Sequence, residues 1–301
     1  MPFQLLLRAT AVSSLLAFAA EINSVRQPAE TLIAHEWGTF TSVAVRAGTQ
    51  QPWAPLTGSP DLPCFVERLG LQNFKYFPGA SVRMETPVIY FYSKVATTLS
   101  VHVGFPRGWV TEWYPKASSV WPTQDALSHA PLLEQGEISW KNVNVQPGVD
   151  PVFPNSIGAS HYFAARNTDA APLDISKQKE KLIFYRGLGN FLVPIRPRFN
   201  PEGNLEIVNA GPEEIQFLMV FENRGGKIGY RVIRNLKDSE VVPLPELTAN
   251  ASDVHKQIAQ NLVEAGLYAK EALAMVETWK DSWFEEGTRV FYLAPQKLVS
   301  S

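Results

Sequence analysis

Residues 88–105 read VIYFYSKVATTLSVHVGF, and this stretch decides the fold class. Its first part, 88–92, is a continuous apolar run, which is typical of a strand buried on both faces. Its second part, 98–105, alternates between apolar residues and polar or small ones, which is typical of a strand with one buried face. No helical pattern separates the two parts, although parallel sheets need a crossover helix between strands. The stretch therefore favours antiparallel sheets.

Most of the chain shows the same pattern of short strands separated by turns. The 23 prolines in 301 residues favour strands and turns over long helices. A hairpin loop is expected at 223–226, where two glycines follow Asn and Arg. Further strands are expected at 37–45, 110–114, 162–165, 182–185, 205–208, 215–222 and 227–233. We therefore predict a mainly β protein with a sandwich-like or barrel-like arrangement of antiparallel sheets.

Helical patterns are confined to residues 249–286, where we expect a pair of helices. Ser252 is expected to cap the first helix. The second carries one apolar stripe suited to covering a sheet. The stripe consists of Ala272, Val276, Trp279 and Trp283. A terminal strand and tail are expected at 287–301, after a β-rich domain at 31–248 that contains a loop-rich segment at 116–160.

Residues 1–20 have the anatomy of a secretory signal peptide. They carry one cation, Arg8, then a mainly apolar stretch, and an A-x-A arrangement at 17–19. The apolar stretch is shorter than the roughly 20 residues needed to cross a bilayer. We expect cleavage after Ala20, a polar spacer at 21–30 and no membrane span in the mature chain. The alternative for this segment is a buried amphipathic helix.

Charge and cysteine content narrow the class of protein further. The chain has 27 Lys and Arg against 29 Asp and Glu, a formal charge of −2, and so lacks the basic surplus of a nucleic-acid binder. Its single cysteine, Cys64, has apolar neighbours and is expected to be a buried small hydrophobe rather than a nucleophile. Export without an intramolecular disulfide is typical of a bacterial periplasmic or secreted protein.

Three segments carry a resemblance to a known group of proteins. They read HEWGTFT at 35–41, RMETPVIYFY at 83–92 and WFEEGTRV at 283–290. The chain resembles an uncharacterised family of exported bacterial proteins with HEWGTFT-like and WFEEGTR-like segments. That family has no established activity, so the resemblance implies an exported protein and no catalytic residues. Its relatives continue beyond the end of this chain, which implies an open sheet edge near the carboxyl end.

Candidate metal ligands are His35, Glu36 and Glu285. His and Glu are metal-ligand types, but adjacent residues on a strand point to opposite faces, so one ligand at most comes from the His35–Glu36 pair. Glu36, Glu85 and the pair Glu285–Glu286 each stand just before a predicted strand. They would form one acidic patch only if alternate strand ends lie together, and exposure at separate ends is the simpler interpretation. We expect no cofactor, with a divalent metal as the alternative.

Candidate catalytic residues belong to a hydrolase hypothesis. Two carboxylates roughly 5–10 Å apart suit glycoside hydrolysis, and Glu85 with Glu112 is the pair considered. His161 is a further catalytic candidate expected in the same cleft, and Arg166 or Arg186 would stabilise developing negative charge. The sequence has no GxSxG elbow, no GxxxxGK[ST] loop and no GxGxxG motif.

Aromatic residues concentrate between positions 109 and 140. Flat aromatic rings on a β scaffold bind the apolar faces of sugars, although core packing is the simpler use of such rings. The candidate ligand-binding residues are Trp109, Trp113, Tyr114, Trp121 and Trp140.

The leading functional hypothesis is a non-enzymatic binding or structural module of the cell envelope, with carbohydrate or an envelope polymer as ligand. The alternative is a hydrolase of envelope or extracellular polymer that uses paired carboxylates or a metal. A scaffold that docks a partner protein is a third possibility.

Overall fold

The computed structural model describes seven stretches of the chain, and every structural statement below refers to them. They are residues 32–51, 62–69, 82–106, 108–129, 135–156, 160–189 and 193–295. The expected signal peptide and spacer lie outside the described residues, as does the tail after residue 295. Strands account for 48% and helices for 17%, with antiparallel sheets, so the expected mainly β fold is confirmed.

The first sheet is built around the apolar run at 88–92. Its antiparallel order is β1 (Ile33–Thr41), β5 (Val82–Tyr92), β12 (Ile183–Gly189), β7 (Gly108–Tyr114) and β4 (Glu67–Arg68). Successive residues of β5 point to opposite faces, and both faces are covered. Val88 and Tyr90 belong to one apolar core, and Ile89 and Phe91 belong to another. The prediction of a strand buried on both faces is confirmed.

The second sheet packs face to face with the first. Its order is β11 (Gln178–Glu180), β10 (Leu173–Ile175), β9 (Gln135–Val145) and β6 (Thr97–Pro106), and β8 (Ser119–Trp121) pairs with β9. The alternating segment forms β6, with Val101, Val103 and Phe105 buried and His102 exposed, as expected. The core between the two sheets combines Ile89 and Ile183 from the first with Ile138 and Trp140 from the second.

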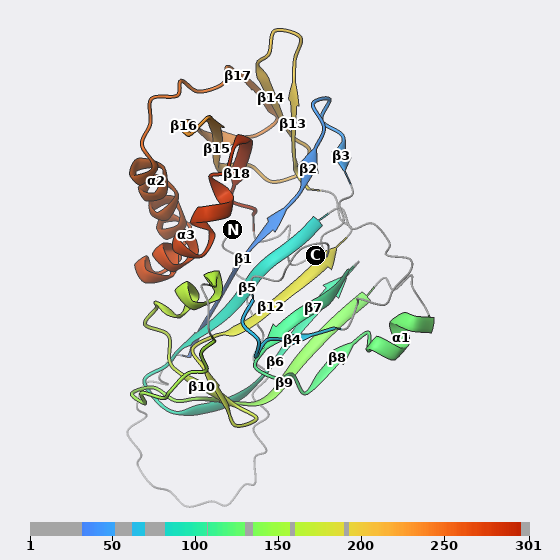
Figure 1. Cartoon of the computed structure of the whole chain (residues 1–301), viewed down its shortest axis with the longest axis vertical. Coiled ribbons are helices and arrows are strands. Elements are labelled where there is room, and N and C mark those ends of the chain that lie inside the picture. The colour runs from blue at the N-terminus through green and yellow to red at the C-terminus, as the bar shows by residue number, and fades with distance from the viewer. Residues whose placement is uncertain are drawn as a thin grey trace, which may run out of the picture.

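Two smaller sheets form the other half of the molecule. One has the order β16 (Lys227–Leu236), β15 (Ile215–Arg224) and β18 (Gly287–Tyr292), and the other β13 (Ile195–Phe199), β14 (Leu205–Asn209) and β17 (Ser239–Val242). Leu218, Val220, Ile195 and Ile207 meet in the core between them. Figure 1 shows these sheets above the two larger ones. The expected hairpin loop joins β15 to β16, with Gly225 and Gly226 at φ 60° and 79°.

Helices α2 (Ala251–Glu264) and α3 (Ala269–Trp283) form the expected pair and precede β18. They lie beside the sheet β16-β15-β18 (Figure 1). Met275 and Trp279 of α3 share a core with Trp37 of β1 and Phe217 of β15, so this core joins the two halves of the molecule. The cap of α2 differs from the prediction, because Asn250 rather than Ser252 accepts the Asp253 N–H at 3.0 Å.

The segment at 116–160 holds more regular structure than expected. It contains β8, the short helix α1 (Gln124–His129) and the eleven-residue strand β9. Val143 and Val145 of β9 are buried at an interval of two, a signal that the sequence carried. The strand expected at 162–165 is wrong, because His161–Arg166 form a 3₁₀ helix, η2, capped by Ser160.

Cys64 is exposed, which corrects the expectation that it is buried. The Val66 N–H donates to the Pro63 carbonyl at 3.1 Å, so Cys64 lies in a turn. Its neighbours Leu62 and Val66 are buried. Apolar neighbours in the sequence do not fix the burial of a residue in a turn, because the chain reverses there.

Candidate functional site

A groove of about 1180 Å³ lies where the edges of three sheets meet. Its walls include β1 of the first sheet, β13 and β18 of the smaller sheets, and the segment 42–50, which contains β2 (Val43–Ala44) and Gln50 of β3 (Gln50–Gln51). Strands β1, β13 and β18 are each the last strand of their sheet within the described part of the chain. The groove therefore forms because these three edge strands do not pair with one another.

Aromatic rings form much of the groove wall. Trp283 at the end of α3 and Phe291 of β18 have ring centroids 5.7 Å apart. The Arg46 guanidinium lies 4.8 Å from the ring centroid of Phe199. Phe40 of β1 also lines the groove. Partly buried rings next to polar groups provide apolar faces and hydrogen-bonding groups in one space.

Three of the predicted carboxylates, Glu85, Glu285 and Glu286, line the groove. The Glu85 carboxylate lies 3.2 Å from Arg83 Nε, and Arg289 Nη2 donates to Glu285 Oε2 at 2.9 Å. Glu286 accepts the Gly225 N–H at 2.8 Å. The loop after α3 and the strand β5 thus bring together acids that are about two hundred residues apart in sequence.

Glu36, the fourth acid of that pattern, lies in a different environment. It is only 4% exposed, and its Oε1 accepts a hydrogen bond from the Tyr185 hydroxyl. Its Oε2 is buried and has no hydrogen-bond partner. Burial raises the pKa of Glu36 from 4.5 to about 8, because the charged form loses its hydration. Glu36 is therefore held as a neutral acid between the two large sheets.

Glu85 and Glu112 do not face one another across the groove. Strand β12 separates β5, which carries Glu85, from β7, which carries Glu112. Glu112 is buried, accepts a hydrogen bond from the Thr111 hydroxyl and lies beside Arg186 in the register of β7 and β12. Arg186 is 4% exposed. These two residues form part of the sheet and do not line the groove.

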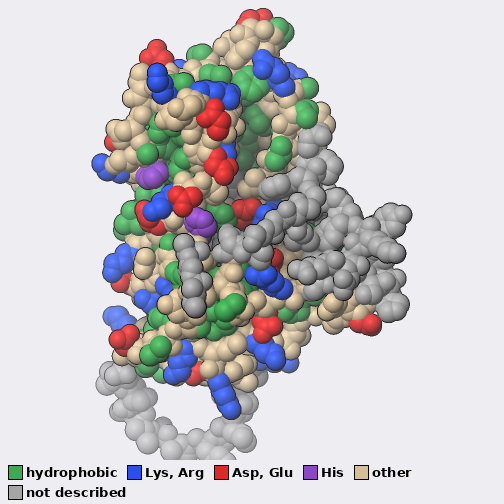
Figure 2. Space-filling model, in the orientation of Figure 1, with side chains coloured by type: hydrophobic (Ala, Val, Ile, Leu, Met, Phe, Trp, Pro, Cys, Tyr) green, Lys and Arg blue, Asp and Glu red, His purple; other side chains and the backbone are tan. Residues whose placement is uncertain are grey.

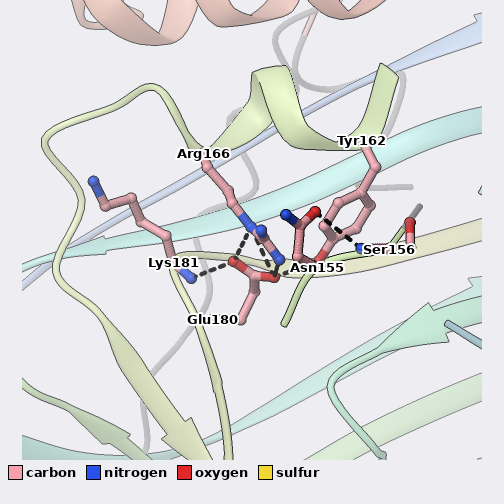
Figure 3. Close-up of polar contacts among 6 residues, drawn as sticks. All are labelled: Asn155, Ser156, Tyr162, Arg166, Glu180 and Lys181. Carbon is pink, nitrogen blue, oxygen red and sulfur yellow. Dashed lines mark hydrogen bonds and ion pairs between the residues drawn. The ribbon is translucent and has the colours of Figure 1, made fainter. Parts of the chain in front are cut away.

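Arg166 is committed to a buried ion pair, as Figure 3 shows. Its Nη2 donates to Glu180 Oε2 at 2.6 Å and its Nε to Oε1 at 2.9 Å, while the Tyr162 hydroxyl donates to the same carboxylate at 2.9 Å. Glu180 is fully buried. Four aromatic rings, those of Phe65, Phe153, Tyr162 and Phe163, surround the guanidinium at 5.0–5.8 Å. This cluster anchors η2 to β11.

The predicted metal ligands are not brought together. His35 contacts Glu271 of α3 and Glu36 contacts Tyr185 of β12, so the two side chains point to opposite faces of β1, and Glu285 lies at the groove. No group of three or more His, Cys, Asp and Glu side chains that could hold a metal ion occurs among the residues the structure describes. His161, a catalytic candidate, is about one-third exposed and lies 3.9 Å from Asp281 rather than beside a candidate carboxylate.

The aromatic window does not form one exposed surface. Trp109, Tyr114 and Trp140 are buried, Trp113 is partly buried, and Trp121 is 45% exposed. Trp140 also donates its indole N–H to the Pro115 carbonyl at 2.8 Å. Rings from this window therefore pack mainly in the core, because inward-facing positions of β7 and β9 need large apolar side chains.

The sequence does not indicate that the groove aromatics share a site, or that Glu271 of α3 belongs to one. Trp283 belongs to the predicted covering stripe of α3, and Phe40 and Phe291 belong to predicted strands. Glu271 is fully buried and lies within hydrogen-bonding distance of His35, which is 236 positions away in the chain. A capping-box position at the start of α3 was the only local signal for Glu271.

Comparisons with known proteins find no relative of this chain. No protein-family model, curated protein or solved structure matches the chain. Among the described residues, no helix is both long enough and apolar enough to span a membrane.

Proposed function

We propose that this chain is a binding module of the cell envelope that holds a carbohydrate ligand in the groove. The observation that carries the proposal is the meeting of aromatic faces and charged groups in one space of about 1180 Å³. Sugar rings present apolar C–H faces that stack on aromatic side chains, and hydroxyls that bind carboxylates and guanidinium groups. The signal peptide expected at 1–20 supports a location outside the cytoplasm.

Trp283, Glu285 and Arg289 are the residues that we expect to contact the ligand. Trp283 offers a partly exposed ring, and Glu285, 63% exposed, already pairs with Arg289 at 2.9 Å. A ligand hydroxyl would accept from the guanidinium and donate to the carboxylate. Acidic and basic side chains are interspersed on the face shown in Figure 2, which suits a neutral, hydroxyl-rich ligand better than a highly charged one.

The test is a glycan array followed by calorimetric titration with the oligosaccharides that bind. Losing one stacking ring or one charged hydrogen bond should weaken binding by about tenfold, so we expect this for Trp283→Ala and for Glu285→Gln. Trp121→Ala is the matched control, because Trp121 is exposed but lies outside the groove. Binding that is lost with Trp121→Ala and kept with Glu285→Gln would place the ligand on the aromatic window. No binding to any glycan would refute the proposal.

The groove carboxylates favour hydrolysis of the bound polymer as the second candidate function. Glu85, Glu285 and Glu286 line the same space, and paired carboxylates are the catalytic groups of most glycoside hydrolases. In that case the oligosaccharide found on the array would be cleaved by the wild type and not by Glu85→Gln. Binding without cleavage would exclude this candidate and leave the binding module in place.

A further inference from the structure

His35 lies at the junction of β1 and the start of α3, in a cluster separate from the groove. Its Nδ1 is 2.9 Å from Glu271 Oε2 and 3.2 Å from Oε1. The side chain of Glu271 is fully buried, whereas that of His35 is 14% exposed. Because an ionised carboxylate only accepts hydrogen bonds, Nδ1 carries the proton. The neutral imidazole then has its lone pair on Nε2.

The carboxylate of Glu271 is held in one orientation by two further donors. The Tyr92 hydroxyl donates to Oε1 at 2.8 Å, and the Tyr268 backbone N–H donates to Oε2 at 2.7 Å. Burial and the neighbouring Glu271 carboxylate raise the pKa of Tyr92, so its hydroxyl remains a donor. Glu271 also lies in the first turn of α3, where the helix dipole favours negative charge.

Two tyrosine rings restrict the imidazole plane. The Tyr268 ring centroid lies 4.6 Å from that of His35, and the Tyr92 ring makes an edge contact at 5.5 Å. Tyr268 is 42% exposed and the His35 side chain 14% exposed, so the cluster borders the solvent. Within the described part of the chain, Glu271 is the only side chain that pairs with the His35 ring through a hydrogen bond.

We propose that His35 and Glu271 form an acid–base dyad that catalyses hydrolysis of small carboxylic esters. His35 Nε2 removes a proton from a water molecule as the water oxygen bonds to the ester carbonyl carbon. The tetrahedral intermediate then breaks the bond to the alcohol oxygen, and the proton on Nε2 passes to the departing alkoxide. Glu271 is the positioning residue, because it fixes the tautomer and stabilises the imidazolium between the two transfers. The proposal does not depend on the groove.

The first test measures hydrolysis of p-nitrophenyl acetate by the full chain. The chain has five histidines, and the four besides His35 also supply imidazole to the ester, so the comparison is between two single substitutions. We expect His35→Gln to lower the second-order rate constant at least about tenfold. His102→Gln, in a side chain that is 60% exposed, should leave the rate unchanged. Equal rates for the wild type and both variants would overturn the proposal.

A second measurement uses the wild type and so avoids any folding defect of a variant. Diethyl pyrocarbonate acylates accessible imidazole nitrogens, and mass spectrometry assigns the modified histidines. We expect the loss of ester hydrolysis to follow modification of His35. Hydrolysis that persists after complete modification of His35 would also overturn the proposal.

The positioning role of Glu271 is tested through the split between kcat and KM for the ester. Glu271→Gln keeps an oxygen acceptor for Nδ1–H but removes the charge that stabilises the imidazolium, so kcat should fall while KM stays unchanged. A purely structural role would leave kcat unchanged, and an unchanged kcat in a folded variant would refute the positioning role.

Discussion

Replacing Glu36 by Gln should stabilise the protein at neutral and alkaline pH. In the folded chain the Glu36 carboxyl has a pKa of about 8, whereas in the unfolded chain its pKa is about 4.5. Between these values the unfolded state binds fewer protons than the folded state, so the free energy of unfolding falls as the pH rises. At 1.36 kcal/mol per pH unit the loss is about 3 kcal/mol at pH 7 and about 5 kcal/mol above pH 8. Below pH 4.5 the carboxyl is neutral in both states, so none of this free energy of unfolding is lost.

Gln is the informative substitution because it preserves the shape of the side chain and cannot ionise. Its amide oxygen takes the place of Oε1 as acceptor for the Tyr185 hydroxyl. The wild type and the variant should therefore unfold at similar urea concentrations near pH 4.5. The variant should be more stable by about 3 kcal/mol at pH 7.

Urea unfolding between pH 4.5 and 9, followed by tryptophan fluorescence, measures this difference directly. Effects of all other titrating groups cancel in the comparison of the two proteins. Glu240→Gln, at an exposed position in β17, is the control and should follow the wild type at every pH. A difference between wild type and Glu36→Gln that stays constant across this range would refute the reasoning, because it would mean that Glu36 titrates alike in both states.

The remaining predictions concern the packing that holds the fold together. Arg166→Met should lower the free energy of unfolding by about 3–5 kcal/mol, because it leaves the Glu180 carboxylate buried without its cation. Arg198→Met, which breaks an exposed ion pair, should cause a much smaller loss in the same urea experiment. Gly108→Ala should cost about 1–3 kcal/mol, because its Cβ would overlap the Leu188 carbonyl of the neighbouring strand. Gly104→Ala, where a Cβ meets nothing within 4 Å, should be nearly neutral, and equal losses at 104 and 108 would contradict this packing.

The sequence predicted the elements whose pattern is local. The run at 88–92 and the alternation at 98–105 report burial directly, because each residue of a strand faces one side. The apolar stripe of α3 likewise predicted its buried face, including Ala272, Val276 and Trp279. The error at 162–165 has a local cause as well, since a short apolar segment suits a 3₁₀ helix as well as a strand.

The site could be predicted only in part, because it depends on pairings between distant segments. Glu85 and Glu285 meet at the groove only because β5 and the loop after α3 border it, and no spacing in the sequence encodes that. The same argument applies to Arg166, because the sequence alone does not distinguish an arginine in a structural ion pair from a catalytic one. Its partner, Glu180, becomes visible only when η2 packs near β11.

Helix α3 connects the two proposed sites and also keeps them apart. Glu271 lies at its first turn and Trp283 at its last residue, so about 18 Å of helix separates the dyad from the groove, at 1.5 Å per residue. A ligand in the groove therefore does not contact His35 directly, and the ester and glycan experiments report on different side chains. Both sites depend on the position of α3, because Met275 and Trp279 pack the helix against the core that contains Trp37. A substitution in that stripe should impair both sites together, whereas Glu285→Gln and His35→Gln should each impair only one.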